Sequence, residues 1–171
     1  MVNPNSTEEL LQLAEQGDLE AQYHLGICFS RGRGVEKNLD MAAHWFDAAA
    51  KKGHSGAQCS LGVCYLNGQG VKKDENKAVE LFRLAAEQGD AHAQYCLGVC
   101  CYFGLGVESD ESEMRRLFEL ARSQGHTSAY FALDEYARGV SPYGGKNSAD
   151  NVVPEISFQD NLAHFQFRPG R

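Results

Sequence analysis

The sequence predicts an all-α protein, a right-handed α–α superhelix (solenoid) of antiparallel helix pairs. The main observation is a block that returns every 36 residues and is marked by Gly17, Gly53, Gly89 and Gly125. The pattern Ala-x3-Leu-Gly follows the first three of these glycines, and the pattern Gly-x-Gly-Val comes next. Each unit then closes on a phenylalanine and small residues. Such a period is typical of a solenoid, because one unit cannot bury its apolar face alone.

The composition narrows the possible classes of protein. A chain of 171 residues with 43% hydrophobic and 10% aromatic residues is expected to fold. Its formal net charge of −7 argues against a nucleic acid or an anionic membrane as partner. No apolar run approaches ~18 residues, so no membrane span is expected. No basic segment followed by an apolar segment opens the chain, so no signal peptide is expected either, which favours a cytoplasmic location.

The chain opens with half a unit. Residues 1–16 predict an N-terminal capping helix, which corresponds to the second helix of a unit. Leu10 stands where Phe46 stands in the next unit. Ser6 and Glu9 have the spacing of a capping box, in which each side chain accepts a hydrogen bond from the backbone amide of the other residue.

The first full unit, residues 17–52, predicts two helices joined by a glycine loop. Asp18 is suited to N-cap a first helix that runs to Ser30, with Leu25 on its apolar face. Gly26 lies in the middle of this helix, where glycine costs about 1 kcal/mol relative to alanine. A glycine returns at this position in the next two units, which indicates that a partner helix approaches closely there.

The second helix of each unit is expected to begin after Asn38, Asp74 or Asp110, all of which are favourable N-cap residues. In the first unit, one side of this helix carries the apolar stripe Ala42, Trp45, Phe46 and Ala49. The same pattern predicts further units at residues 53–88 and 89–124.

The repeated sequence pattern closely resembles that of the Sel1-like repeat family, an α-solenoid family related to the tetratricopeptide repeats. The resemblance covers residues 17 to about 125. It implies a protein–protein interaction scaffold or adaptor. Some disulfide-rich relatives are associated with penicillin binding or β-lactamase-like activity, so a weak hydrolase of that type is an alternative. A structural module of a larger array is another.

After the third unit the pattern decays. Residues 125–140 predict a degenerate half repeat, in which Asp134 replaces the helix glycine. Residues 141–171 predict an irregular C-terminal tail. Three interpretations of the tail stay open: packing over the end of the stack, a peptide in the groove of this or a neighbouring chain, and disorder. The aromatic residues that suit a peptide role are Phe158, Phe165 and Phe167.

The first helices are expected to line the concave side of the superhelix, as in the related tetratricopeptide architecture. Their groove-facing residues are predicted to be Tyr23, Ile27, Arg31, Cys59, Val63, Leu66, Asn67, His92, Tyr95, Val99, Tyr102, Phe103 and Phe131. A large apolar and aromatic lining points to a protein or peptide partner. The alternative is that some of these residues, Val63 and Val99 above all, pack one first helix on the next.

The sequence predicts neither a catalytic site nor a bound metal or cofactor, and thus no enzyme. All six cysteines fall in first helices, which favours reduced, buried thiols over disulfides across a helical hairpin. His92, Cys96 and Cys100 share one helix face, but the four-ligand spacing of structural zinc is missing. The Gly-x-Gly loops join helix to helix, which does not suit a phosphate loop.

Overall fold

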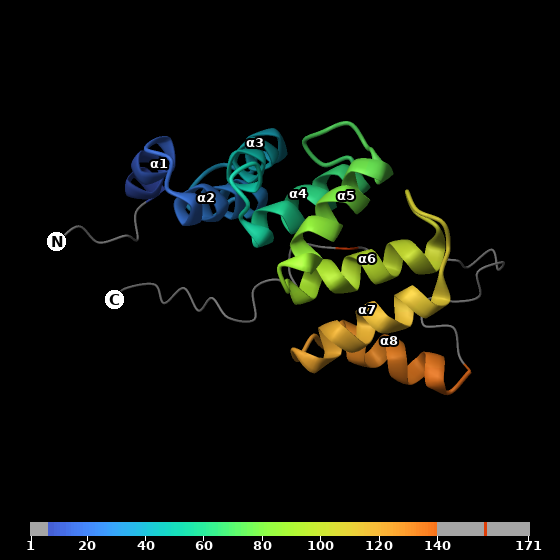
Figure 1. Cartoon of the computed structure of the whole chain (residues 1–171). Coiled ribbons are helices and arrows are strands. Elements are labelled where there is room, and N and C mark those ends of the chain that lie inside the picture. Colours follow the sequence, from blue (N-terminus) through green and yellow to red (C-terminus); the bar gives the residue numbers. More distant parts are fainter. Residues whose placement is uncertain (1–6, 140–155, 157–171) are drawn as a thin grey trace.

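The computed structural model describes residues 7–139 and residue 156. All regular secondary structure in this part of the chain is α-helical (Figure 1). The helices are α1 (Thr7–Glu15), α2 (Leu19–Arg31), α3 (Leu39–Ala50), α4 (Ser55–Asn67), α5 (Glu75–Glu87), α6 (Ala91–Phe103), α7 (Glu111–Ser123) and α8 (Thr127–Ala137). The prediction of helix pairs is confirmed.

The helices pack in chain order, each against the one before it and the one after it (Figure 1). The first helices of the units are α2, α4, α6 and α8, and we call them A helices. The second helices are α3, α5 and α7, and we call them B helices, together with α1 at the N-terminal end. The A helix α4 also contacts the next A helix, α6.

The helix starts follow the predicted N-cap chemistry. The Asp18 carboxylate accepts a hydrogen bond from the Ala21 amide at 2.8 Å, and the Asn38 side chain accepts one from the Met41 amide at 3.0 Å. His54 and His126 cap α4 and α8 through Nδ1. Each cap satisfies an amide of the first turn that has no acceptor inside the helix.

The close approach of the two helices in each pair depends on the glycine in the middle of the A helix. A Cβ atom at Gly26 would lie 2.5 Å from the Phe46 ring, and one at Gly62 would lie 2.6 Å from the Phe82 ring. Gly98 meets Phe118 in the same way, at 2.5 Å. These three phenylalanines are fully buried. The predicted close approach of a partner helix is therefore confirmed.

The glycine loops join one unit to the preceding one. Gly70, with a φ of 69°, lies against the backbone of Leu39 at the start of α3. Gly106, with a φ of 62°, lies against the backbone of Glu75 at the start of α5. A side chain at either position would both strain the backbone and collide with the neighbouring helix.

A set of glutamines also joins the units, and the sequence analysis did not anticipate it. Gln22 on α2 donates a hydrogen bond to the carbonyl of Ala14 at 3.0 Å. Gln58 and Gln94, at the same repeat position, donate to the carbonyls of Ala50 and Ala86, both at 3.4 Å. In each case the glutamine is a second donor to a carbonyl near the end of the preceding B helix, which also accepts the amide of the glycine that follows the helix.

The fourth unit departs from this pattern. Tyr130 stands where the glutamine stands in earlier units, and Asp134 stands in place of the glycine. The Asp134 carboxylate pairs with Arg138 at 2.6 Å. The predicted tail lies outside the described residues except for Ile156, so Phe158, Phe165 and Phe167 have no structural account.

The glycine contact predicts the effect of a single added methyl group. We expect Gly62→Ala to lower the free energy of unfolding by about 2 kcal/mol, because the clash with Phe82 outweighs the better helix propensity of alanine. Urea denaturation measures the loss. In the double variant Gly62→Ala/Phe82→Leu the loss should be smaller than the sum of the two single losses. A Gly62→Ala protein as stable as wild type would contradict the contact.

Candidate functional site

The thirteen residues predicted to line a groove, which we call the A-helix wall, all lie on A helices. Nine of them are buried: Tyr23, Ile27, Cys59, Val63, Leu66, His92, Tyr95, Val99 and Tyr102. Arg31 and Phe103 are half-buried, while Asn67 and Phe131 are exposed. The expectation of openly accessible tyrosine rings is therefore wrong for Tyr23, Tyr95 and Tyr102, whose exposed fractions are 9%, 6% and 4%. The role of the wall in binding stays a prediction.

Tyr23 and Tyr95 are buried because the next unit fills space around their rings. The Tyr23 ring lies 4.5 Å from the ring of His54, the residue that caps the start of the next A helix. The Tyr95 ring lies between His126 at 4.7 Å and Phe118 at 5.4 Å. Burial removes water from the Tyr23 hydroxyl and raises its pKa to about 12. These rings thus pack one unit on the next.

One residue of the C-terminal segment lies at the A-helix wall. Ile156 is 3% exposed and belongs to the same apolar cluster as Val63, Leu66 and Tyr102. The Asn67 side-chain amide donates a hydrogen bond to the main-chain carbonyl of Ile156 at 3.0 Å. In Figure 1 the short red segment marks this residue beside α4 and α6. The wall therefore accommodates an aliphatic side chain and binds a main-chain carbonyl.

Asn67 is suited to this contact by its position and chemistry. It is the last residue of α4, and it is exposed. Its NH₂ group is a donor without charge, which matches a main-chain carbonyl. The positions 36 residues before and after it hold Arg31 and Phe103. Of these three A helices, only α4 presents an amide here.

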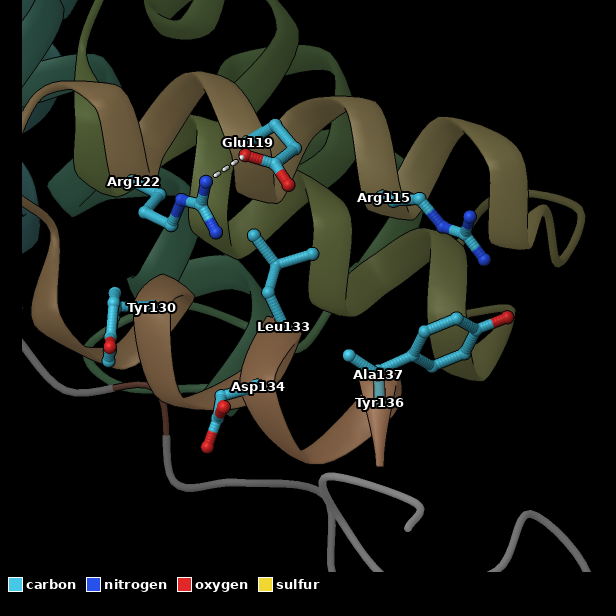
Figure 2. Close-up of a pocket in the computed structure, with 8 residues that line it drawn as sticks. All are labelled: Arg115, Glu119, Arg122, Tyr130, Leu133, Asp134, Tyr136 and Ala137. Atoms are coloured by element: carbon cyan, nitrogen blue, oxygen red, sulfur yellow. Dashed lines mark ion pairs between the residues drawn. The ribbon is translucent and has the colours of Figure 1, made fainter. Parts of the chain in front are cut away.

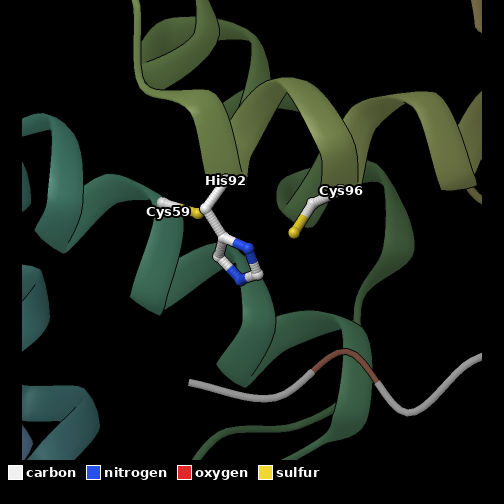
Figure 3. Close-up of side chains that lie close together, drawn as sticks. All are labelled: Cys59, His92 and Cys96. Atoms are coloured by element: carbon white, nitrogen blue, oxygen red, sulfur yellow. The ribbon is translucent and has the colours of Figure 1, made fainter. Parts of the chain in front are cut away.

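Three potential metal ligands converge between α4 and α6 (Figure 3). The ligand atoms of Cys59, His92 and Cys96 all lie within 4.8 Å of one another, and all three residues are buried. The sequence pattern places His92 with Cys96 and Cys100 on one helix face, and it gives no sign of Cys59 because that residue comes from another unit.

The hydrogen bonds around His92 oppose metal binding at this cluster. Nδ1 of His126 accepts a hydrogen bond from the Ala129 amide at 3.3 Å, so its Nε2 carries the hydrogen atom. That hydrogen points to Nδ1 of His92, 3.1 Å away, which places the His92 hydrogen on Nε2. Burial also raises the pKa of Cys96 well above its ordinary value. The arrangement therefore favours a protonated Cys96 thiol, and the absence of a metal stays a prediction.

A cleft that the sequence did not predict lies between α7 and α8 (Figure 2). Its volume is about 520 Å³. Figure 2 shows Leu133 pointing from α8 toward α7, between the Arg122–Glu119 ion pair and Arg115. Arg115 lies over the ring of Tyr136 at 4.9 Å.

This cleft is the repeat counterpart of a second one, of about 480 Å³, beside α5, α6 and α7. Five of its eight lining residues follow residues of the second cleft by 36 positions: Glu119 after Arg83, Arg122 after Ala86, Tyr130 after Gln94, Leu133 after Leu97 and Ala137 after Cys101. In the second cleft α7 supplies a further wall that includes Leu117 and Leu120. Both clefts therefore arise from the stacking of units.

The stacked helix pairs define a repeat protein of the α-solenoid class. The sequence profile of the Sel1 repeat matches residues 19–54, 55–90 and 91–126, so the chain belongs to the Sel1 repeat family. These units begin two residues after those drawn from the glycines. The expected family and the expected right-handed solenoid of helix pairs are confirmed. No curated protein sequence matches the chain.

Solved structures of Sel1 repeat proteins are similar to it. The structure of c5321, a protective antigen of uropathogenic Escherichia coli strains with an SLR fold, is 37% identical with a TM-score of 0.72, over 80% of this chain and 30% of that one. A Sel1 repeat protein from Oxalobacter formigenes is 31% identical with a TM-score of 0.72, over 78% of this chain and 53% of that one. The chain thus spans about half or less of these two relatives.

A third structure shows the fold alone. Cysteine rich protein B of Helicobacter pylori is 24% identical with a TM-score of 0.58, over 75% of this chain and 98% of that one. The six cysteines of this chain are all free thiols. Among the residues that the structure describes, no helix has both the length and the apolar character needed to cross a membrane.

The buried thiols and Tyr23 predict an alkaline limit to stability. Burial raises the pKa of Cys64 from 9.0 to about 12 and that of Cys101 to about 11. Above about pH 9 the folded state therefore keeps protons that the unfolded state loses. The contribution of the buried thiols to the free energy of unfolding is complete below about pH 9 and decreases as the pH rises toward 12. Urea midpoints measured from pH 8 upward should fall, and Cys64→Ala should make the decrease less steep. A constant midpoint up to about pH 11 would contradict this.

Proposed function

We propose that the chain is a protein–protein interaction scaffold that binds a peptide segment of a partner protein at the A-helix wall, beside Asn67. Sel1 repeats are generally interaction scaffolds, which supports the coarser part of this proposal. The binding site consists of Asn67 and the apolar cluster that holds Ile156, and we call it the Asn67 subsite. The protein acts by binding and does not itself catalyse a reaction.

The observation that carries the proposal is the way in which Ile156 is held. A peptide offers a repeating main-chain carbonyl and a side chain, and the Asn67 subsite already binds both groups. Main-chain hydrogen bonds supply affinity without regard to sequence, and side-chain burial supplies selectivity. A neutral amide donor accepts a peptide of any charge, whereas the net charge of −7 disfavours strongly acidic partners.

A reducing compartment such as the cytoplasm suits this scaffold. Five of the six cysteines are buried in the helices that form the wall, and only Cys28 is half-exposed. Burial of neutral thiols stabilises the fold only while the thiols stay reduced.

The Asn67 subsite predicts which surface variant loses the partner. Asn67→Asp keeps the size of the side chain but replaces the amide donor by a carboxylate that repels a carbonyl oxygen. Affinity capture from the native host with quantitative mass spectrometry should recover the specific partners at least about fivefold less with this variant, the cost of one hydrogen bond replaced by a repulsion.

Leu84→Ala is the matched control, because Leu84 is 49% exposed on the B helix α5, away from the subsite. This control should recover the partners at the wild-type level. Equal recovery by Asn67→Asp and wild type would count against binding at the subsite. Equal loss of partners in Asn67→Asp and Leu84→Ala would indicate that the partners bind at a different surface.

A further inference from the structure

We propose that Ile156 is a built-in ligand of the Asn67 subsite, and that the subsite accepts from a partner the same two groups: a branched aliphatic side chain and the main-chain carbonyl of that residue. This inference rests on the proposed function and names the class of segment that the scaffold binds. The chain's own Ile156 is the resident occupant, and a partner segment replaces it.

The contact has the features of ligand binding. Ile156 and Asn67 are 89 positions apart in the sequence, so the contact is not a consequence of local chain geometry. The side chain is 3% exposed, and the carbonyl accepts the Asn67 amide at 3.0 Å. A buried β-branched side chain fits a site of fixed shape, since it has few rotamers to lose.

The repeat period does not account for the position of Ile156. Ile156 follows Leu120 by 36 positions, and Leu120 lies on the B helix α7. A complete fourth unit would therefore place residue 156 on a B helix beside α8, at the cleft between α7 and α8. Instead, Ile156 is bound to α4.

The surface of α8 agrees with this position of Ile156. Tyr130 and Phe131 on α8 are 54% and 59% exposed. If the C-terminal segment served only to cap the end of the stack, its buried isoleucine would be expected beside these rings. Its position beside α4 favours occupation of the subsite over capping of the end.

The subsite occurs in only one of the three complete units. Arg31 and Phe103 occupy the positions equivalent to Asn67, and neither provides a neutral amide. Ile156 and a partner residue would occupy the same apolar position beside Asn67, so they compete for it. The apparent affinity for a partner is then reduced by the fraction of molecules in which Ile156 is bound.

Binding of a synthetic peptide to the full-length chain tests the proposal. The probe is a fluorescein-labelled peptide of residues 150–162, and the readout is fluorescence anisotropy. We expect Ile156→Asp protein, whose subsite is vacated, to bind the probe at least about tenfold more tightly than wild type does. Asn67→Asp added to Ile156→Asp should abolish the gain, and a probe with aspartate in place of the isoleucine should not bind.

A second measurement does not depend on the probe. The side-chain NH₂ resonances of Asn67 should shift between wild type and Ile156→Ala, and should stay near their wild-type positions in Ile156→Val. Circular dichroism and thermal melts confirm that each variant is folded. Equal binding of the probe to wild type and Ile156→Asp, no binding to either, or unshifted Asn67 resonances would overturn the built-in ligand.

The outcomes separate this inference from the proposed function. If the probe fails but Asn67→Asp still loses the partners in affinity capture, the built-in ligand is wrong and the scaffold proposal stands. If the probe binds as expected but Asn67→Asp recovers all partners, the built-in ligand stands, and partners bind at a different surface.

Discussion

In each complete unit the A helix and the B helix meet where a glycine faces a phenylalanine ring, and the geometry of the stack follows from this contact. Because Gly62 has no side chain, the Phe82 ring lies directly on the backbone of α4. The same contact in the neighbouring units gives every pair the same spacing, so the units can stack in register. Where Asp134 replaces the glycine, the pattern of complete pairs ends. A binding surface made by several units depends on this uniform spacing.

Close stacking also decides where a ligand can bind. Tyr23 and Tyr95 pack one unit on the next, as the position of Tyr95 between His126 and Phe118 illustrates. The recognition that we propose therefore uses the end of an A helix. Asn67 is the last residue of α4, and the apolar cluster beside it is shared by α4 and α6.

The sequence predicted those features that depend on one helix or on the repeat period. The N-cap role of Asp18 and the close approach at Gly26 are of this kind, because local geometry or the repeated pattern determines them. Contacts between units were predicted poorly. The approach of Cys59 to Cys96, the burial of Tyr102 and the position of Ile156 depend on how far successive units rotate and on a non-repeated segment, neither of which a linear pattern contains.

The glutamine bonds between units have a consequence for the dynamics of the array. Each of these side chains holds the end of the preceding B helix, so an interior unit cannot open without releasing its neighbour as well. Tyr130 stands at the fourth position of this series, and the glutamine link stops there. Local unfolding should therefore start at α8 and proceed toward the N-terminus. Amide protons of α8 should then exchange with solvent before those of α4 and α6.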